Sequence, residues 1–148
     1  MKPENLPIGY WIKKADQLLT EGIDRVQARF GLSRTGWQIL NAIKENGSIK
    51  EEGLVFLMKP FAGVADVERI LEQLEQDGLV EHLHGPYRLS HKGQELHGTC
   101  LAGQKEFRVR CMKDISGPAY DTTVSTLRKM VENLEPADEE QKDPSGAL

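Results

Sequence analysis

Basic side chains that could hold an anion occur near the starts of expected helices and on an expected two-stranded ribbon. Guanidinium and ammonium groups bind phosphate, and arginine also bonds the O6 and N7 atoms of guanine in a DNA major groove. The candidates for contact with a DNA duplex are Arg34, Lys50, Lys59, Arg69, Arg88 and Lys92, with His82 and His84 on the ribbon. Arg69 could reach a base edge or a phosphate, Arg88 a phosphate beside the ribbon, and Arg34 a phosphate at a helix start. The plain alternative is that all of them are solvated surface charges.

The segment from residue 64 to residue 93 must position most of these groups. Apolar residues recur at steps of three and four between positions 64 and 74, which predicts an amphipathic helix, and Gly78 follows where that periodicity stops. Residues 79–83 alternate as a half-buried strand does, and a tight turn leads to a short return strand at 87–90. A helix, a two-stranded ribbon and a following helix form the core of a winged helix, whose usual purpose is to lay a helix in a DNA groove.

Helical spacing of apolar residues predicts further helices on both sides of this unit. An opening helix runs from Ile8 to Phe30 and carries more apolar surface than one small core requires. After a break at 116–118, where Pro118 fits the first turn, a last helix runs to Leu134 with apolar residues close to a heptad seam. End helices of this kind commonly bury the contact of a homodimer. The other expected elements are a helix at 34–46 capped by Ser33, an extended link at 48–50, a helix at 51–59, and a long helix capped by Ser90 that runs to about residue 115.

The chain has 148 residues, which suits one domain with one core. We expect a mainly α single domain, 1–148, with a winged helix-turn-helix, long N- and C-terminal dimerisation helices and a small two-stranded antiparallel wing. Within it, residues 33–92 form the winged-helix DNA-binding unit, and residues 6–32 together with 93–134 form the helical dimerisation region. Residues 135–148 are acidic, proline-bearing and aperiodic, which predicts a disordered tail.

Composition excludes several classes of protein. The formal net charge of −4 argues against a surface that is basic throughout, so DNA contact would need a local basic patch. No apolar run approaches the roughly 20 residues that cross a bilayer, and residues 1–5 lack the apolar segment of a secretory signal, so we expect a cytoplasmic protein. The sequence has no nucleophile motif, glycine-rich phosphate loop or credible carboxylate pair, so we expect neither an enzyme nor a bound cofactor.

Histidines and cysteines give no firm metal or redox motif. His82, His84, His91, His97 and Cys100 lie near one another in sequence, but no metal-binding spacing supports them, and exposed or structural histidines are the plainer interpretation. Cys100 and Cys111 fall on one expected helix, where three turns separate them by roughly 16 Å, too far for a disulfide. We expect two small buried apolar residues rather than a redox switch.

Four passages resemble the MarR family of dimeric winged-helix transcription regulators. Residues 31–40 (GLSRTGWQIL) look like that family's second helix, and residues 67–80 (VERILEQLEQDGLV) look like its recognition helix and glycine stop. Residues 87–93 (YRLSHKG) are similar to its strand followed by L-T-x-x-G, and 124–134 end the chain as the family does. The resemblance implies a homodimer that regulates transcription by binding double-stranded DNA at a pseudo-palindromic operator.

The resemblance places Val64, Ala65 and Asp66 at the start of the recognition helix, where typical members carry Ser, Thr, Lys and Arg. Between residues 62 and 78 there are five acidic residues and one basic residue, Arg69. The wing is also short, because residues 84–86 replace a longer loop. A second hypothesis is therefore a winged-helix protein–protein interaction module that has lost DNA binding.

The resemblance also implies a small-molecule effector, bound between the dimer helices and the winged unit. Tyr10, Trp11 and Trp37 could line such a crevice. The alternative is that these aromatic residues are anchors of the core, because amphipathic helices need such anchors.

Overall fold

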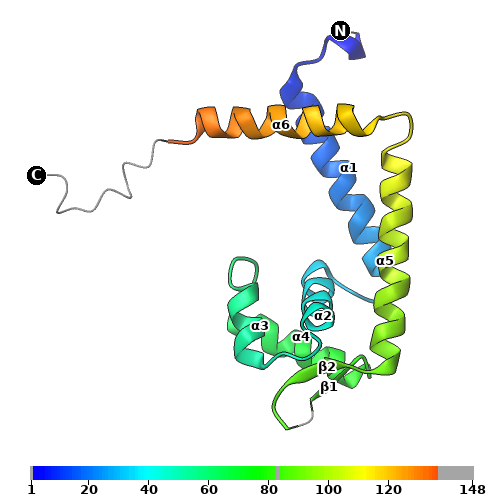
Figure 1. Cartoon of the computed structure of the whole chain (residues 1–148), viewed down its shortest axis with the longest axis vertical. Coiled ribbons are helices and arrows are strands. Elements are labelled where there is room, and N and C mark those ends of the chain that lie inside the picture. Colours follow the sequence, from blue (N-terminus) through cyan, green and yellow to red (C-terminus); the bar gives the residue numbers. More distant parts are fainter. Residues whose placement is uncertain (1, 83, 137–148) are drawn as a thin grey trace, which may run out of the picture. The chain divides into compact units, whose positions relative to one another are not determined.

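The structure is a computed structural model that describes residues 2–82 and 84–136, so most of the expected tail lies outside the described residues. Its elements are a short 3-10 helix Pro3–Asn5, then α1 (Ile8–Ala28), α2 (Arg34–Asn46), α3 (Glu51–Met58), α4 (Val64–Gln76), β1 (Val80–His82), β2 (Tyr87–Leu89), α5 (His91–Cys111) and α6 (Gly117–Leu134) (Figure 1). The chain divides into two compact units, Met1–Val109 and Arg110–Leu148. The expected dimerisation region is thus divided between the two units.

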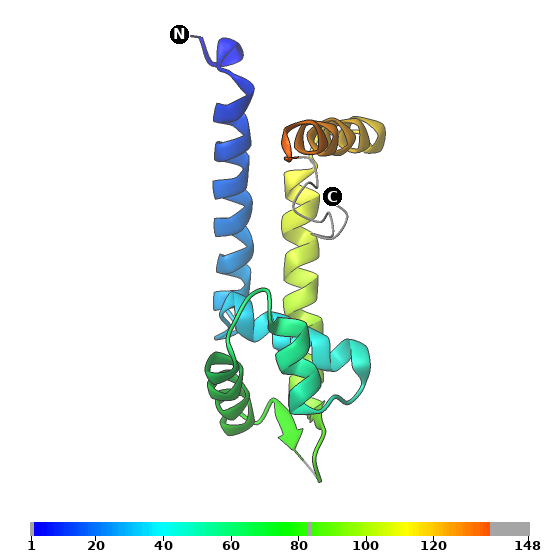
Figure 2. The ribbon, with the colours of Figure 1, turned by 90° about the vertical axis from the view of Figure 1, so that its left-hand side faces the viewer.

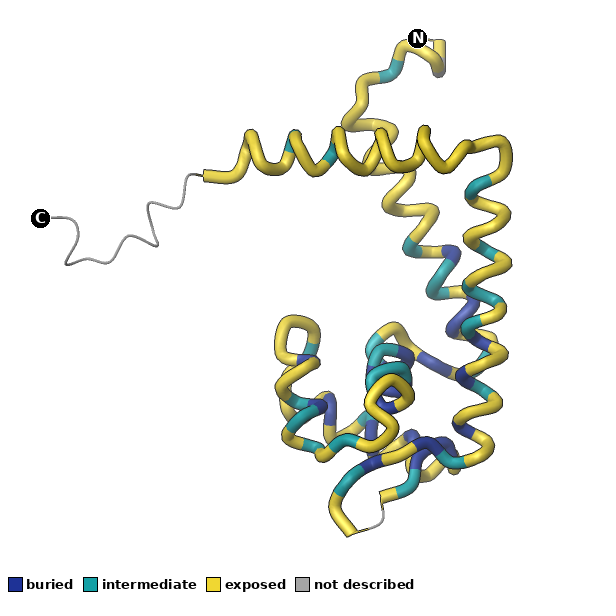
Figure 3. Tube along the Cα trace, in the orientation of Figure 1, coloured by how far each residue is buried: buried dark blue, intermediate teal, exposed yellow. Residues whose placement is uncertain are grey.

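The core of the first unit lies among α2, α3, α4 and the two strands, where Figure 3 shows most of the buried backbone. Helices α2 and α4 bury most of the apolar stripe that their sequences predict, because helices of this length are stabilised mainly by packing of one face. Full burial of one such aliphatic side chain contributes roughly 1.5–3 kcal/mol. The most deeply buried side chains are Ile39, Leu40 and Ile43 of α2, Leu54 of α3, Val67 and Leu71 of α4, and Cys100 of α5.

The expected helix caps are present. The Ser33 hydroxyl accepts a hydrogen bond of 3.0 Å from the Gly36 N–H and caps α2. Ser90 does the same for α5, accepting from the Gly93 N–H. Ser116 caps α6 in the same way, which was not predicted from the sequence. After α2, Gly47 takes a φ of 75°, and Gly78, two residues beyond the end of α4, takes 74°, as their sequence positions predict.

Three helices end earlier than the apolar pattern predicts. The first ends at Ala28 rather than at residue 30, the third at Met58 rather than at residue 59, and α5 at Cys111 rather than near residue 115. In both α1 and α5 the apolar repeat extends beyond the helix. Phe30 and Ile115 fit the repeat but lie in the segments that link the helices. Asp114 has a positive φ of 60°, which a helix cannot continue through.

The wing pairs β1 with β2 in antiparallel register, with Val80 opposite Leu89, Glu81 opposite Arg88, and His82 opposite Tyr87. Tyr87 also exchanges two backbone hydrogen bonds with Ile49, of 3.0 and 2.8 Å. The expected link at 48–50 therefore forms an additional edge of the sheet and ties the start of α3 to the wing.

Close packing of α1 and α5 depends on glycine. Both helices extend from the winged-helix unit (Figure 2). A β-carbon at Gly22 would fall within the ring of Phe107, and one at Gly103 would lie 3.0 Å from a methyl group of Val26. Towards its N-terminus α1 leaves large apolar side chains exposed: Ile8, Tyr10, Trp11, Ile12, Leu18 and Leu19.

In the second unit, α6 has Pro118 in its first turn, as expected. Apolar side chains recur along one face of the helix, and all but Leu127 are exposed: Tyr120, Val124, Leu127, Val131 and Leu134. In the described part of the chain, no helix is long and apolar enough to cross a membrane.

Replacing glycine by alanine should have opposite effects on stability at two positions of α5. A β-carbon at Gly93 would collide with the backbone carbonyl of Leu79, whereas one at Gly98 meets nothing within 4 Å. We expect Gly93→Ala to lower the free energy of unfolding by about 2 kcal/mol, because neither backbone can move aside cheaply. Gly98→Ala should raise it by about 0.5–1 kcal/mol, because alanine favours the helix. Urea denaturation measures both, and equal midpoints for the two variants would contradict the packing described.

Candidate nucleic-acid interface

The outward face of α4 is the surface that a winged helix offers to a duplex. Because Val67, Leu71 and Leu74 point into the core, residues on the opposite side of the helix must point away from it. That opposite side carries Ala65, Arg69, Glu72 and Gln76, all of them exposed. Val64 and Asp66 are also exposed in the first turn of α4. The four sequence candidates on α4 therefore lie within its first two turns, with Ala65 and Arg69 on the outward side, Asp66 paired with Arg69, and Val64 on a different side of the helix.

Each of the three candidate arginines lies beside a carboxylate. Arg69 Nη2 lies 3.5 Å from Asp66 Oδ1, one turn back along α4. Arg88 Nε lies 3.0 Å from Glu81 Oε2, its partner across the wing. Both pairs are solvent-exposed, so each contributes no more than about 1 kcal/mol and phosphate can compete for the arginine. The two carboxylates lower the positive potential of this surface, but both arginines can still bind phosphate.

Arg34 has a different position from the other two arginines. Its guanidinium donates hydrogen bonds of 3.1 and 3.2 Å to both carboxylate oxygens of Asp24, which joins the start of α2 to α1. Both bonds come from the Nη2 atom, and the two side chains are about half exposed, so the pair contributes no more than about 1 kcal/mol. Arg34 therefore links α1 to α2 at the surface, and a phosphate would have to compete with Asp24.

The other basic candidates lie around the helix-turn-helix and the wing. Lys50 and Lys59 flank α3, and both are exposed and make no side-chain hydrogen bond or ion pair with another described residue. His84 is exposed in the wing turn, where its φ is 59°. His82 stacks on Tyr87 with ring centroids 4.2 Å apart, and Lys92 Nζ donates to the Asp77 carbonyl at 2.9 Å. Lys50 and Lys59 are thus the best-placed candidates for phosphate.

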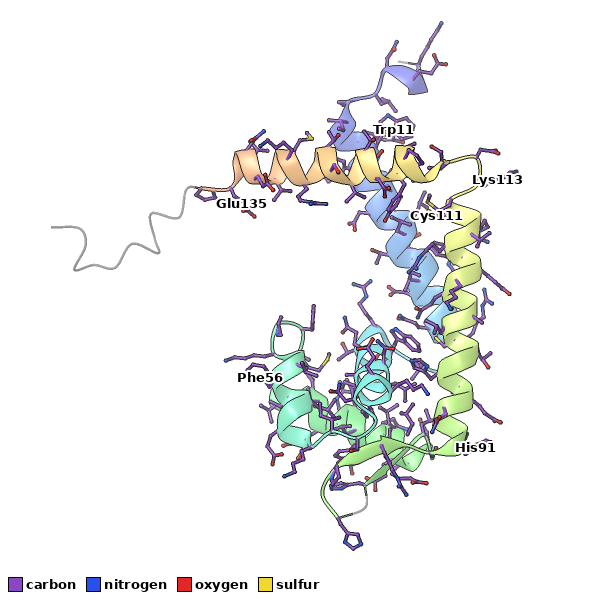
Figure 4. All side chains as sticks on the ribbon, viewed as in Figure 1. Trp11, Phe56, His91, Cys111, Lys113 and Glu135 are labelled. Atoms are coloured by element: carbon purple, nitrogen blue, oxygen red, sulfur yellow. The ribbon has the colours of Figure 1, made fainter. Side chains whose placement is uncertain are left out.

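An exposed apolar cluster on the helix-turn-helix was not anticipated from sequence. Phe56, Leu57, Phe61 and Val64 are 75%, 45%, 65% and 53% exposed, and we call them the turn patch. Figure 4 marks Phe56 at the outer edge of α3. Their exposure could have been predicted from the sequence, because Phe56 and Phe61 do not share the helical spacing of the buried residues Leu54 and Met58. Several large apolar side chains this close together usually mark a binding surface.

A groove of about 420 Å³ lies between α1 and α2. Its lining residues are Leu19, Thr20, Ile23, Gln27, Arg34, Trp37 and Gln38. Gln27 is 3% exposed, and its Oε1 atom has no hydrogen-bond partner among the described residues. A buried acceptor left without a donor costs roughly 1–3 kcal/mol, and folded proteins contain only a few of them.

Of the three aromatic residues expected to line a crevice, the structure places only Trp37 at this groove. Tyr10 and Trp11 lie in the first turn of α1, where their rings meet edge to face at 5.1 Å and remain exposed. Figure 4 marks Trp11 on this helix. Trp11 precedes Leu19, the first groove residue on α1, by roughly 12 Å of helix. The structure therefore does not bring the three aromatic side chains together.

Behind Trp37, a polar contact is built into the core. The Trp37 and His97 rings stack with centroids 4.8 Å apart, and His97 Nε2 lies 2.9 Å from Asn41 Oδ1. Burial lowers the pKa of His97 below 6.5, nearby Lys44 lowers it further, and Glu45 opposes the shift.

The two cysteines differ in exposure. Cys100 is buried, as expected, and burial raises the pKa of its thiol. Cys111 is exposed, contrary to expectation, because it lies at the end of α5. Within the described residues, no three histidine, cysteine or acidic side chains gather as a metal site.

No protein-family model matches the sequence, and no curated protein matches it either. Solved structures do match. The reduced form of MarR from E. coli is 17% identical, has a TM-score of 0.66, and pairs 85% of this chain with 94% of its own. The YusO protein from Bacillus subtilis is 17% identical with a TM-score of 0.72, over 84% of this chain and 92% of its own. The Mycobacterium tuberculosis MarR family protein Rv2887, in a complex with DNA, is 17% identical with a TM-score of 0.68, over 85% and 98%. The chain has the winged-helix fold of the MarR structures.

Acidification should destabilise the fold through His97. Because its pKa in the folded protein is lowered, the unfolded chain binds the proton more readily, and stability falls as pH drops below about 6.5. His97→Gln can still donate to Asn41 but does not titrate. We expect the free energy of unfolding of the native protein to fall more steeply between pH 7 and pH 5 than that of His97→Gln, as measured by urea denaturation. Parallel pH curves would show that His97 carries no such penalty.

Proposed function

We propose that the protein is a DNA-binding transcriptional regulator of the MarR type that binds a pseudo-palindromic operator as a homodimer. The observation that carries the proposal is the exposed face of α4, flanked by the wing, in a fold shared with a protein whose structure contains DNA. A recognition helix of this kind enters the major groove, and the helices of a two-fold dimer reach half-sites about 34–36 Å apart.

Exposed apolar surface supports the homodimer. The N-terminal half of α1 and one face of α6 carry large apolar side chains that the chain itself leaves uncovered. Surfaces of this kind are stable in water when another molecule buries them, and a second copy related by a two-fold axis buries both at once. We propose α1 and α6 as the dimer contact.

Specific DNA binding is the direct test. The full-length protein should bind duplex DNA taken from upstream of its gene, followed by fluorescence anisotropy. Arg69→Ala should weaken that binding by roughly 5- to 150-fold, because one base-edge contact is worth about 1–3 kcal/mol. Gln76→Ala, on the same face of α4 but at its last turn, is the matched control and should change the affinity little.

Sedimentation of the same samples should give a dimer at micromolar concentration, free and on DNA. A monomer under both conditions would refute the dimer. Absence of any sequence-specific binding, with Arg69→Ala indistinguishable from the native protein, would refute the regulator.

A second candidate is the winged-helix protein–protein interaction module. The turn patch and the ion-paired arginines favour it, because both suit a protein partner better than a phosphate backbone. The anisotropy titration separates the candidates, since this module would bind no duplex specifically.

We also propose that the groove between α1 and α2 binds a small-molecule effector. Gln27 lines the groove, and its buried, unpaired Oε1 would accept from a ligand N–H or O–H group that enters deeply enough to reach it, while Trp37 offers an aromatic surface. Arg34 lies at the same groove and is held by Asp24, so an acidic ligand could compete for it. A flat molecule with one hydrogen-bond donor and one acidic group matches these three features.

Replacing Gln27 should separate ligand binding from stability. Trp11→Phe leaves Trp37 as the sole tryptophan, whose fluorescence reports binding of hydroxylated aromatic carboxylates. In that background Gln27→Leu should raise the free energy of unfolding by about 1 kcal/mol, because an orphan acceptor is removed, and should weaken ligand binding about fivefold or more. Gln38→Ala, also at the groove, is the control. Unaltered fluorescence across the whole panel would overturn the effector site.

A further inference from the structure

The first turn of α4 has an apolar exposed surface. Val64 and Ala65 are both exposed there, and Phe61 precedes them in the turn. The start of a recognition helix is the part that meets base edges. Among the four bases, thymine alone presents an apolar group, its C5-methyl, in the major groove, and apolar side chains recognise it by contact. The chemistry of this turn therefore matches thymine rather than phosphate.

A polar pair links the first turn of α4 to the second. Asp66 lies in the first turn and Arg69 in the second, 3.5 Å apart and both exposed. A G·C pair presents the N7 and O6 acceptors of guanine next to the N4 donor of cytosine. An arginine supplies donors for the first two atoms, and a neighbouring carboxylate accepts from the third. The ion pair thus offers a matching set of groups to one G·C edge.

The rest of α4 discourages non-specific attraction. Glu68, Glu72 and Glu75 are exposed along the helix and repel phosphate. Lys50 and Lys59 remain as cations without a side-chain partner among the described residues around α3. Because phosphate contacts supply most non-specific DNA affinity, this surface must draw its affinity largely from base edges.

We infer that α4 reads a half-site in which thymine methyl groups meet Val64 and Ala65 and a G·C pair meets Asp66 and Arg69. This inference rests on the proposed DNA binding and specifies its chemistry. DNA is favoured over a protein partner here because one short stretch of helix combines the thymine-matching and G·C-matching groups. Phe56 and Leu57 of the turn patch lie on α3 and take no part in this reading.

The probe is a pool of random-sequence duplexes from which the full-length protein selects its own sites. The selected duplex is then made with deoxyuridine in place of thymidine in each half-site, which removes only the methyl groups. Each methyl group lost should weaken binding about fourfold, and a symmetric pair about 16-fold. Val64→Ala should reduce the thymidine-to-deoxyuridine ratio, whereas Leu57→Ala, exposed on α3, should leave it unchanged.

Asp66→Asn tests the polar half of the site. Losing the negative charge should strengthen binding to unrelated duplexes, because one repulsion with phosphate disappears. At the same time the preference for G·C over A·T at the selected position should fall about tenfold. A merely structural role for Asp66 would lower both affinities together.

Two results would overturn the inference, and they differ from each other. Specific sites that bind equally well with thymidine and deoxyuridine would remove the thymine reading and leave the regulator standing. Failure to select any sequence would remove both the thymine reading and the regulator.

Discussion

The junction between the end of α4 and the start of α5 determines how the recognition surface is presented. Ser90 accepts from the Gly93 N–H, donates through its hydroxyl to the Gly78 carbonyl, and donates its own N–H to the Leu79 carbonyl at 3.0 Å. Gly93 lies so close to that carbonyl that no side chain fits between them. One residue thus caps α5, closes the wing and terminates α4. Because α4, the wing and α5 meet there, the direction of α4 is held relative to the long helix behind it.

The charges on this surface would favour selective DNA binding over tight DNA binding. A protein of net charge −4 that pairs its arginines with carboxylates gives up much of the attraction that draws a regulator onto any DNA. What remains is a helix face with an apolar first turn and one ion pair, together with two lysines beside α3. If the proposed DNA binding holds, such a face would discriminate between sequences by contact and donor pattern, since long-range charge would contribute little. The same features would also suit a protein partner, which is why both candidates share one surface.

The groove and the core meet at Trp37. One side of this residue lines the space next to Gln27 and Arg34, and its ring stacks on His97 behind it. Arg34 also ties α2 to α1 through Asp24. A ligand that drew Arg34 away from Asp24 would therefore loosen the contact between α1, proposed for the dimer, and α2, the first helix of the winged unit. The ion pair between Arg34 and Asp24 would then connect the proposed dimer helix α1 to the winged unit.

The sequence by itself determined the helices, their caps and the winged-helix order, because these depend on interactions within a few residues. Ser33, Ser90, Gly47 and Gly78 could be assigned from their position beside an apolar repeat. The partners of the arginines could not, since Arg34 meets Asp24 only when α2 folds against α1, and Arg88 meets Glu81 only in the register of the wing. The exposure of Phe56, the unpaired Gln27 oxygen and the separation of Tyr10 from Trp37 likewise depend on how whole helices pack. Periodicity shows which residues share a face, and only tertiary packing decides what that face meets.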